Sequence, residues 1–162
     1  MKVFQIKLSP SPAQVRAINK QIEEHRNLYN YCLAKKIAAW EGEKKNLSCF
    51  DLIKTEIPLA KKNGAVSNHS AMQQTLRRLD KSYNAFFKKN ASFPRFKNSD
   101  RFRTIDYTYG DGCKIKNGAL YLQNVGFVKC LSLRTPEKIK ALSVTRSGDD
   151  YYVNLTYEYA GD

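Results

Sequence analysis

The sequence predicts an α+β protein, in which a small antiparallel β-barrel is interrupted by a helical insertion of about three helices. Up to Pro94, apolar residues recur three and four positions apart, which is typical of amphipathic helices; after it they alternate and are broken by turns. A lone amphipathic strand precedes the helices, and only the C-terminal half can supply its partners. We therefore expect residues 1–10 to form the first strand, 11–100 the insertion and 101–162 the rest of the barrel.

The N-terminal elements carry clear start signals. We expect the first strand at residues 3–8 and a long helix that continues to about Trp40. Ser11 can cap this helix, Pro12 suits its first position, and Gln14 can complete a capping box. The helix should therefore begin directly after the strand.

Two more helices complete the predicted insertion. Ser48 and Asp51 mark the start of the second, which Pro58 is expected to interrupt or end. The third should span about Asn68 to Lys89. Its apolar stripe follows a helical period. The stripe consists of Met72, Leu76, Leu79, Tyr83, Phe86 and Phe87.

The C-terminal half predicts a half-buried antiparallel sheet. Asn117-Gly118 and residues 147–150 are typical hairpin turns. Alternation and turns delimit six strands. The expected strands are Arg103–Tyr109, Cys113–Lys116, Ala119–Leu122, Phe127–Leu133, Ile139–Arg146 and Tyr151–Tyr159.

Charge points to a polyanionic partner. The chain has 28 Lys and Arg against 15 Asp and Glu, a formal charge of +13. Between Arg77 and Arg103, nine basic residues accompany only two acids, Asp80 and Asp100. A basic cluster mixed with aromatic residues favours nucleic acid. Its candidate phosphate contacts are Arg77, Arg78, Lys81, Arg95, Lys97, Arg101 and Arg103.

Several other classes are disfavoured. No apolar run is long enough to cross a membrane, and the N-terminus does not resemble a signal peptide. The four cysteines are scattered along the chain, which favours reduced, buried thiols in a cytoplasmic protein. These cysteines are Cys32, Cys49, Cys113 and Cys130. Nucleic-acid binding would place the protein at the nucleoid.

We predict no catalytic residues, no metal site and no cofactor. The acids are dispersed, whereas two-metal phosphodiester hydrolysis needs carboxylates that converge on the metals. No phosphate-binding glycine loop and no nucleophile elbow occurs. His25 and His69 are the only histidines, and each is expected to cap, pack or contact nucleic acid.

An ordered set of segments resembles the N-terminal half of TnpB, a family of transposon-encoded, RNA-guided DNA endonucleases related to compact type V CRISPR effectors. The first two segments are Leu8–Gln14 and Arg26–Ala34, and the next two are Ala71–Phe87 and Phe93–Lys97. Two later strands, at 124–129 and 139–146, are also similar to the family. The resemblance covers nearly the whole chain.

The resemblance implies a wedge-domain β-barrel interrupted by a helical recognition domain with helix-turn-helix character. In the family these parts hold a guide RNA and read a short motif beside a double-stranded DNA target. The RuvC nuclease begins with a strand that carries a catalytic Asp. Asp162 has no flanking strand here. We therefore expect the nuclease domain to be missing or to be a separate partner.

The same resemblance implies that four residues contact base edges of the DNA and so read its sequence. Gln73, expected on the outward side of the third helix, matches a family Gln that can contact a base edge, because an amide donates and accepts together. His69 lies one turn earlier, and Thr108 and Tyr109 match a polar pair near the same DNA. His69 and Tyr109 depart from the family pattern. Phe93 and Phe96 are expected in the core.

Two alternatives remain at the level of sequence. The first is a stand-alone, non-catalytic regulator that occludes a DNA site without guide RNA. The second is a structural protein associated with RNA or the ribosome. An open reading frame that continues into a strand with Gly-x-Asp would separate a nuclease fragment from both.

Overall fold

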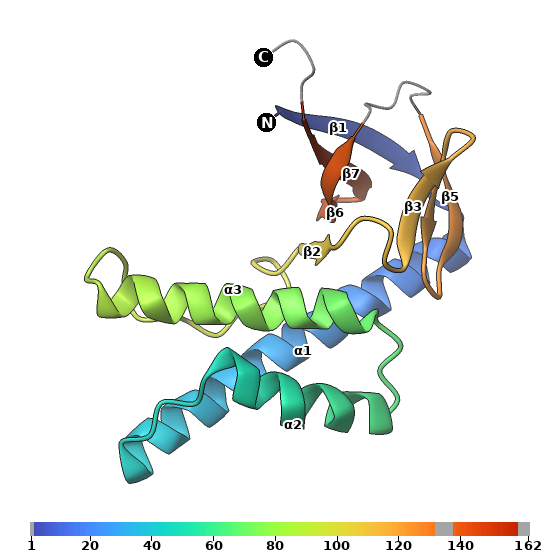
Figure 1. The fold of residues 1–162 in the computed structure, drawn as a ribbon. Coiled ribbons are helices and arrows are strands. Elements are labelled where there is room, and N and C mark those ends of the chain that lie inside the picture. Colours follow the sequence, from blue (N-terminus) through green and yellow to red (C-terminus); the bar gives the residue numbers. More distant parts are fainter. Residues whose placement is uncertain (1, 132–137, 159–162) are drawn as a thin grey trace. The chain divides into compact units, whose positions relative to one another are not determined.

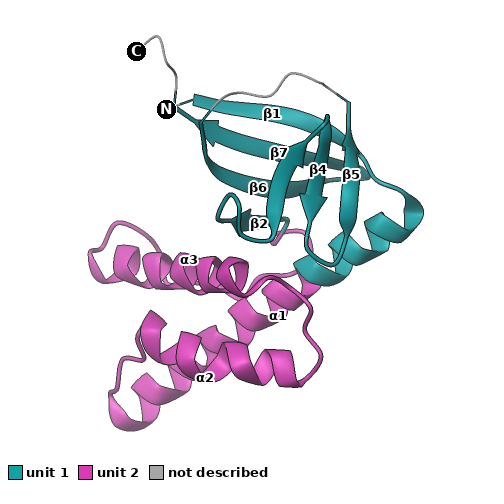
Figure 2. Ribbon diagram, turned by 45° about the vertical axis from the view of Figure 1, so that its right-hand side comes forward, with its two compact units in different colours: residues 1–22, 103–162 teal, residues 23–102 magenta. Residues whose placement is uncertain are grey.

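The computed structural model describes residues 2–131 and 138–158. It divides into two compact units, residues 1–22 with 103–162, and residues 23–102 (Figure 2). The described strands and the start of the first helix belong to the first unit, and the remaining helical residues belong to the second (Figure 1 and Figure 2). This confirms the predicted α+β class, a barrel interrupted by a helical insertion. Leu133, Tyr159 and Asp162, which the sequence predictions included, lie outside the described residues.

In the described part of the chain, seven antiparallel strands form a nearly closed barrel (Figure 2), and their order is β2-β6-β7-β1-β5-β4-β3. The strands are β1 (Lys2–Ser9), β2 (Thr104–Tyr107), β3 (Cys113–Lys116), β4 (Ala119–Leu122), β5 (Gly126–Cys130), β6 (Ile139–Ser147) and β7 (Asp150–Tyr157). The predicted β3 and β4 match these bounds, whereas β2 is shorter than predicted at both ends.

The first strand finds its partners in the C-terminal half, as predicted. β1 pairs along its length with β7, with Ile6 opposite Val153, and its end pairs with β5, with Leu8 opposite Cys130. Ile6 and Leu8 are buried while Val3 is exposed. The alternation in the sequence therefore set the register, because a slip of one residue would expose both buried side chains.

The predicted hairpin turns are present. Asn117 and Gly118 have φ angles of 53° and 75°, the positive values that a type I′ turn requires. Ser147 pairs with Asp150 across the second turn, where Gly148 has a φ of 60°. Both turns join strands that pair directly, so local turn chemistry determines these hairpins.

The first helix, α1 (Pro12–Glu43), begins within the barrel unit. Its predicted capping box is formed. The backbone N–H of Gln14 donates to Ser11 Oγ at 3.2 Å, and the backbone N–H of Ser11 donates to Gln14 Oε1 at 3.0 Å. Ile18 and Ile22 are buried, and Gln21 donates to the carbonyl of Gln123 at 3.0 Å. The helix start is thus tied to the barrel.

The second helix, α2 (Cys49–Lys62), begins at the predicted box of Ser48 and Asp51. The prediction that Pro58 interrupts or ends it was wrong, since the helix runs through Pro58 and is capped at Asn63. Pro58 lies on the exposed side, whereas Ile57 is fully buried. Water can satisfy the exposed carbonyl that lacks its partner there, and burial of the opposite face holds the helix together.

The third helix, α3 (His69–Phe87), begins at its N-cap Asn68. The first four stripe residues are buried, which confirms that part of the predicted face. They are Met72, Leu76, Leu79 and Tyr83. Phe86 is half-buried and Phe87 is 50% exposed, so the apolar stripe of the last turn leaves the core.

The four cysteines are buried and free, as the sequence predicts. Desolvation raises the pKa of the Cys32 thiol to about 12 and that of Cys113 to about 11. These thiols are therefore protonated at neutral pH and are poor nucleophiles. No helix in the described part of the chain is long and apolar enough to cross a bilayer.

Candidate nucleic-acid interface

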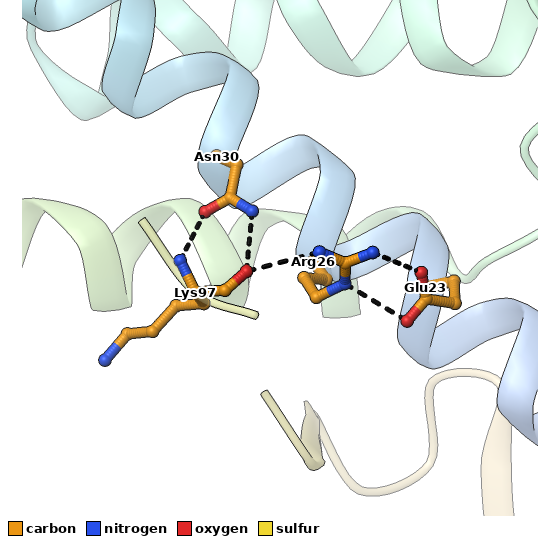
Figure 3. Close-up of polar contacts among 4 residues, drawn as sticks. All are labelled: Glu23, Arg26, Asn30 and Lys97. Atoms are coloured by element: carbon orange, nitrogen blue, oxygen red, sulfur yellow. Dashed lines mark hydrogen bonds and ion pairs between the residues drawn. The ribbon is translucent and has the colours of Figure 1, made fainter. Parts of the chain in front are cut away.

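The segment that follows α3 is held against α1 by its backbone. The side-chain amide of Asn30 donates to the carbonyl of Lys97 and accepts from the Lys97 amide, both at 2.8 Å (Figure 3). Arg26 reaches the same carbonyl at 3.3 Å and is held by Glu23 through two bonds of 2.6 and 3.1 Å. The Lys97 side chain extends away from this anchor (Figure 3). The backbone of Lys97 is fixed, while its ammonium group lies 6.0 Å from the ring centroid of Tyr29.

Two aromatic residues of this segment are not where the sequence placed them. Phe93 is 43% and Phe96 is 54% exposed, so the expectation that both belong to the core was wrong. Pro94 between them is buried instead. The proline occupies the interior position of the turn, and its neighbours are directed outward.

Four of the predicted phosphate contacts line one open groove of about 470 Å³ in the helical unit. They are Lys81 from α3 and Arg95, Lys97 and Arg101 from the anchored segment. Among the described residues, no Asp or Glu lines the groove. The other lining residues are Tyr29, Ser82, Ala85, Ala91, Ser92, Phe93 and Pro94. This groove, called the basic groove below, has the charge and openness to follow a phosphate backbone.

The outward side of α3 leads toward this groove. His69, Gln73, Arg77 and Lys81 follow one another at intervals of four residues, and so share one side of the helix. His69, Arg77 and Lys81 are exposed, and Gln73 is half-buried. The Gln73 amide nitrogen lies 3.0 Å from His69 Nε2. The two predicted base readers of α3 therefore form one polar pair.

Arg78 differs from the other candidate phosphate contacts. Its guanidinium lies 4.8 Å from the ring centroid of Phe102, and the side chain is half-buried. Its charge also contributes to the lowered pKa of the buried His25. Arg78 thus helps to hold the helical unit together, in a stacking geometry that suits arginine.

The remaining candidates lie in the barrel unit. Thr108 and Tyr109 stand in the connection between β2 and β3, where Thr108 is exposed and Tyr109 half-buried. The Tyr109 hydroxyl accepts from the Ile115 amide at 3.3 Å, and the Thr108 carbonyl accepts from the Asp111 amide at 3.0 Å. Arg103 is exposed directly before β2. The loop is ordered by its own bonds.

His25 packs in the interior of the helical unit. Its Nδ1 lies 2.6 Å from Thr75 Oγ1, and Nε2 has no partner. Burial, followed by the charges of Arg78 and Lys61, lowers its pKa from 6.5 to about 3, so the ring is neutral. Within the described residues, no group of three or more His, Cys, Asp or Glu could hold a metal ion.

Sequence reasoning missed an aromatic pocket of about 150 Å³ beside the basic groove. Its lining includes Trp40 from α1, Phe86 and Phe87 from α3, and Phe93, which also lines the groove. The adjacent pair Phe86-Phe87 was the available signal, because neighbouring residues on a helix point about 100° apart and cannot both enter one core. The anchors Arg26 and Asn30 left no comparable signal.

Comparison with known proteins gives two matches. Residues 1–45 match a family model described as "Helix-turn-helix domain" (HTH_OrfB_IS605). In this structure those residues comprise β1 and the whole of α1. The chain is 27% identical over 144 residues to "Putative RNA-guided DNA endonuclease InsQ" of Escherichia coli (strain K12). The alignment covers 88% of this chain and 33% of that protein, so the chain spans about a third of its relative's length.

Proposed function

We propose that this chain, a relative of the N-terminal part of the TnpB family, binds guide RNA and target DNA as the recognition portion of a TnpB-like, transposon-associated system. The basic groove carries this proposal, since Lys81, Arg95, Lys97 and Arg101 converge there without an acid. Such a surface binds phosphate regardless of sequence and supplies most of the affinity for a nucleic acid.

Within this proposal, positioning and reading are done by different groups. The cations of the groove, with Arg77 and Arg103, position the nucleic acid through phosphate contacts. The His69–Gln73 pair reads a base edge in the motif beside the target. Thr108 and Tyr109 contact the same DNA from the barrel. Arg78 contributes by holding Phe102 and the helical unit in shape.

Strand cleavage is assigned to no residue of this chain. The described residues contain no acid cluster suited to magnesium, and phosphodiester cleavage of the RuvC type needs one. We propose that the chain recognises nucleic acid and that a nuclease domain supplies any cutting. Its place of action would be the nucleoid, in the cytoplasm.

A stand-alone DNA-binding regulator is the second candidate. The helix-turn-helix match and the outward His69–Gln73 pair favour it, because a helix side with a base reader and flanking arginine is enough to recognise duplex DNA. In that case the protein occludes a site without RNA. The two candidates differ in whether DNA preference depends on a bound RNA.

Purification from the native host, followed by sequencing of the bound RNA, separates these candidates. The leading proposal predicts enrichment of one structured RNA, and loss of DNA sequence preference after ribonuclease treatment. A regulator would keep its DNA preference after that treatment. Recovery of bulk cellular RNA in proportion to its abundance, with no sequence-dependent DNA binding, would contradict both.

A further inference from the structure

We propose that the aromatic pocket of the helical unit binds an unpaired base of a single-stranded RNA whose phosphates lie in the basic groove. The pocket is lined by Trp40, Phe86, Phe87 and Phe93, with Glu41 and Asn46 among its polar residues. This inference rests on the proposed function and adds to it a defined site for one nucleotide.

Three large aromatic side chains of the pocket are exposed to an unusual degree. Trp40 is 47%, Phe87 50% and Phe93 43% exposed, and they gather at one place on the helical unit. Clustered exposure of this kind marks an interaction site more often than scattered single residues do. The cluster therefore indicates a site that a ligand or partner covers.

The rings of the pocket are ordered before any ligand arrives. Phe93 packs edge-on against Phe86, with ring centroids 5.1 Å apart, and against Tyr83 at 5.5 Å. Phe87 lies 5.6 Å from Phe86. Such contacts stabilise aromatic pairs beyond simple burial and restrict the side chains. A flat ligand entering the pocket loses little affinity to ordering these rings.

The neighbouring charge identifies the occupant. Phe93 lines both the pocket and the basic groove, so a ligand that spans them presents a flat apolar group beside an anionic one. A nucleotide has this composition, and its base stacks on aromatic rings while its phosphate meets arginine. An apolar peptide does not match a groove with four cations and no acid.

Single-stranded RNA fits this site better than a duplex does. Paired bases are stacked within the helix and cannot reach aromatic side chains, whereas RNA loops and bulges present unstacked bases. Glu41 can accept a hydrogen bond from a base amino group or a ribose hydroxyl, and the Asn46 amide can donate or accept. The pocket would therefore fix one unpaired nucleotide of the bound RNA.

Trp40 is the only tryptophan of the chain, so its fluorescence reports directly on the pocket. The probe is an unstructured oligouridine of about ten nucleotides, compared with the same strand annealed to its complement and with single-stranded DNA of equivalent sequence. We expect the single-stranded RNA to quench Trp40 with the affinity measured by anisotropy of a labelled RNA. The duplex should bind without quenching.

Phe87→Ala should weaken single-stranded RNA binding about tenfold and leave duplex binding unchanged, because Phe87 lines the pocket but not the basic groove. Phe93→Ala, which alters the pocket and the groove together, should weaken single-stranded RNA binding at least as much. Phe50→Ala is the matched control, because Phe50 is 73% exposed on α2 and lies outside the pocket. Far-ultraviolet circular dichroism verifies that each variant is folded.

RNA binding without quenching, or with wild-type affinity in both variants, would overturn the pocket and leave the proposed function standing. Equal affinity and quenching with single-stranded DNA would overturn the assignment to RNA. Absence of any nucleic-acid binding would instead refute the proposed function itself.

Discussion

Gln73 illustrates how one side chain on α3 could set sequence preference. It is half-buried and paired with His69 Nε2 at 3.0 Å, so its amide is already oriented. We expect Gln73→Ala to lower discrimination between preferred and other duplexes by about 1–3 kcal/mol, with little change in overall affinity. Folding should barely change, since alanine is the better helix former. Binding to a randomised duplex library, with guide RNA supplied where binding needs it, measures this effect.

Asn84→Ala provides the control for that experiment, because Asn84 is exposed on the same helix but one turn beyond Lys81. This variant should keep the wild-type motif. If the Gln73 variant also prefers the wild-type motif to the same degree, Gln73 is a surface residue and the family's base reader does not extend to this chain.

His25 makes the stability of the helical unit depend on pH. Its pKa is about 3 in the fold and 6.5 in the unfolded chain, so between these values the unfolded chain binds more protons. The free energy of unfolding should then fall as pH drops below 6.5, by at most about 1.4 kcal/mol per pH unit. In urea denaturation at pH 7 and pH 5, His25→Gln should lose less stability than the wild type. Equal losses would contradict this account.

Residues with a local signal were the ones that the sequence could place. Helix caps form through contacts between residues three apart, a spacing that is visible in the sequence. These caps consist of Ser11 with Gln14 and of Ser48 with Asp51. Burial of the cysteines was also predictable. Asn30 and Lys97, by contrast, are 67 residues apart, and no short-range pattern links them. The four cations of the basic groove were predicted as phosphate contacts, but their convergence required the fold.

At the scale of elements, the segment after α3 depends on α1 for its position. Asn30→Ala would leave the amide and carbonyl of Lys97 without their strongest partner, at a cost of about 1–3 kcal/mol. Since Arg95 and Arg101 flank this anchor, nucleic-acid affinity should also fall, although Asn30 is not one of the residues that line the basic groove. Urea denaturation and anisotropy of a labelled RNA measure the two effects.

Asn27→Ala is the matched substitution, because Asn27 is exposed on α1 within one turn of Asn30. It should leave stability and affinity near the wild-type values. A loss of stability in Asn30→Ala with unchanged affinity would show that the segment does not position the groove.

Elements whose neighbours are close in sequence were predicted best. The hairpin of β3 and β4 matches residue for residue, because Asn117-Gly118 fixes its turn and alternation fixes its strands. The continuation of α2 through Pro58 could not be foreseen, since it depends on burial of Leu52 and Ile57 in the tertiary fold. The exposure of Phe93 could not be foreseen either, because it depends on the burial of Pro94 in the tertiary fold.

At the scale of the whole molecule, the proposed function assigns recognition to this chain and cleavage to a nuclease domain. We expect the purified chain to cut neither DNA nor RNA in the presence of magnesium, because its described acids do not converge. Incubation with labelled duplex and single strands tests this expectation. Cleavage that copurifies with the protein through several columns and disappears on substitution of one of its acids would refute it.

The formal charge of +13 raises the question whether affinity comes from the basic groove or from the whole surface. Two triple variants with equal changes in net charge separate these possibilities. One reverses Arg95, Lys97 and Arg101 to Glu in the groove. The other reverses the exposed Lys62, Lys116 and Lys129 to Glu outside it.

The salt dependence of duplex DNA binding by these two variants and the wild type tests the basic groove most directly. If about six phosphates are neutralised, log K of the wild type should fall with a slope near −5 against log salt. Reversal in the groove should reduce the slope to about −3, because about three phosphate contacts remain, and should weaken binding to all sequences alike, while the control triple keeps the wild-type slope. Equal weakening by both triples, or wild-type binding by the groove triple, would contradict the account.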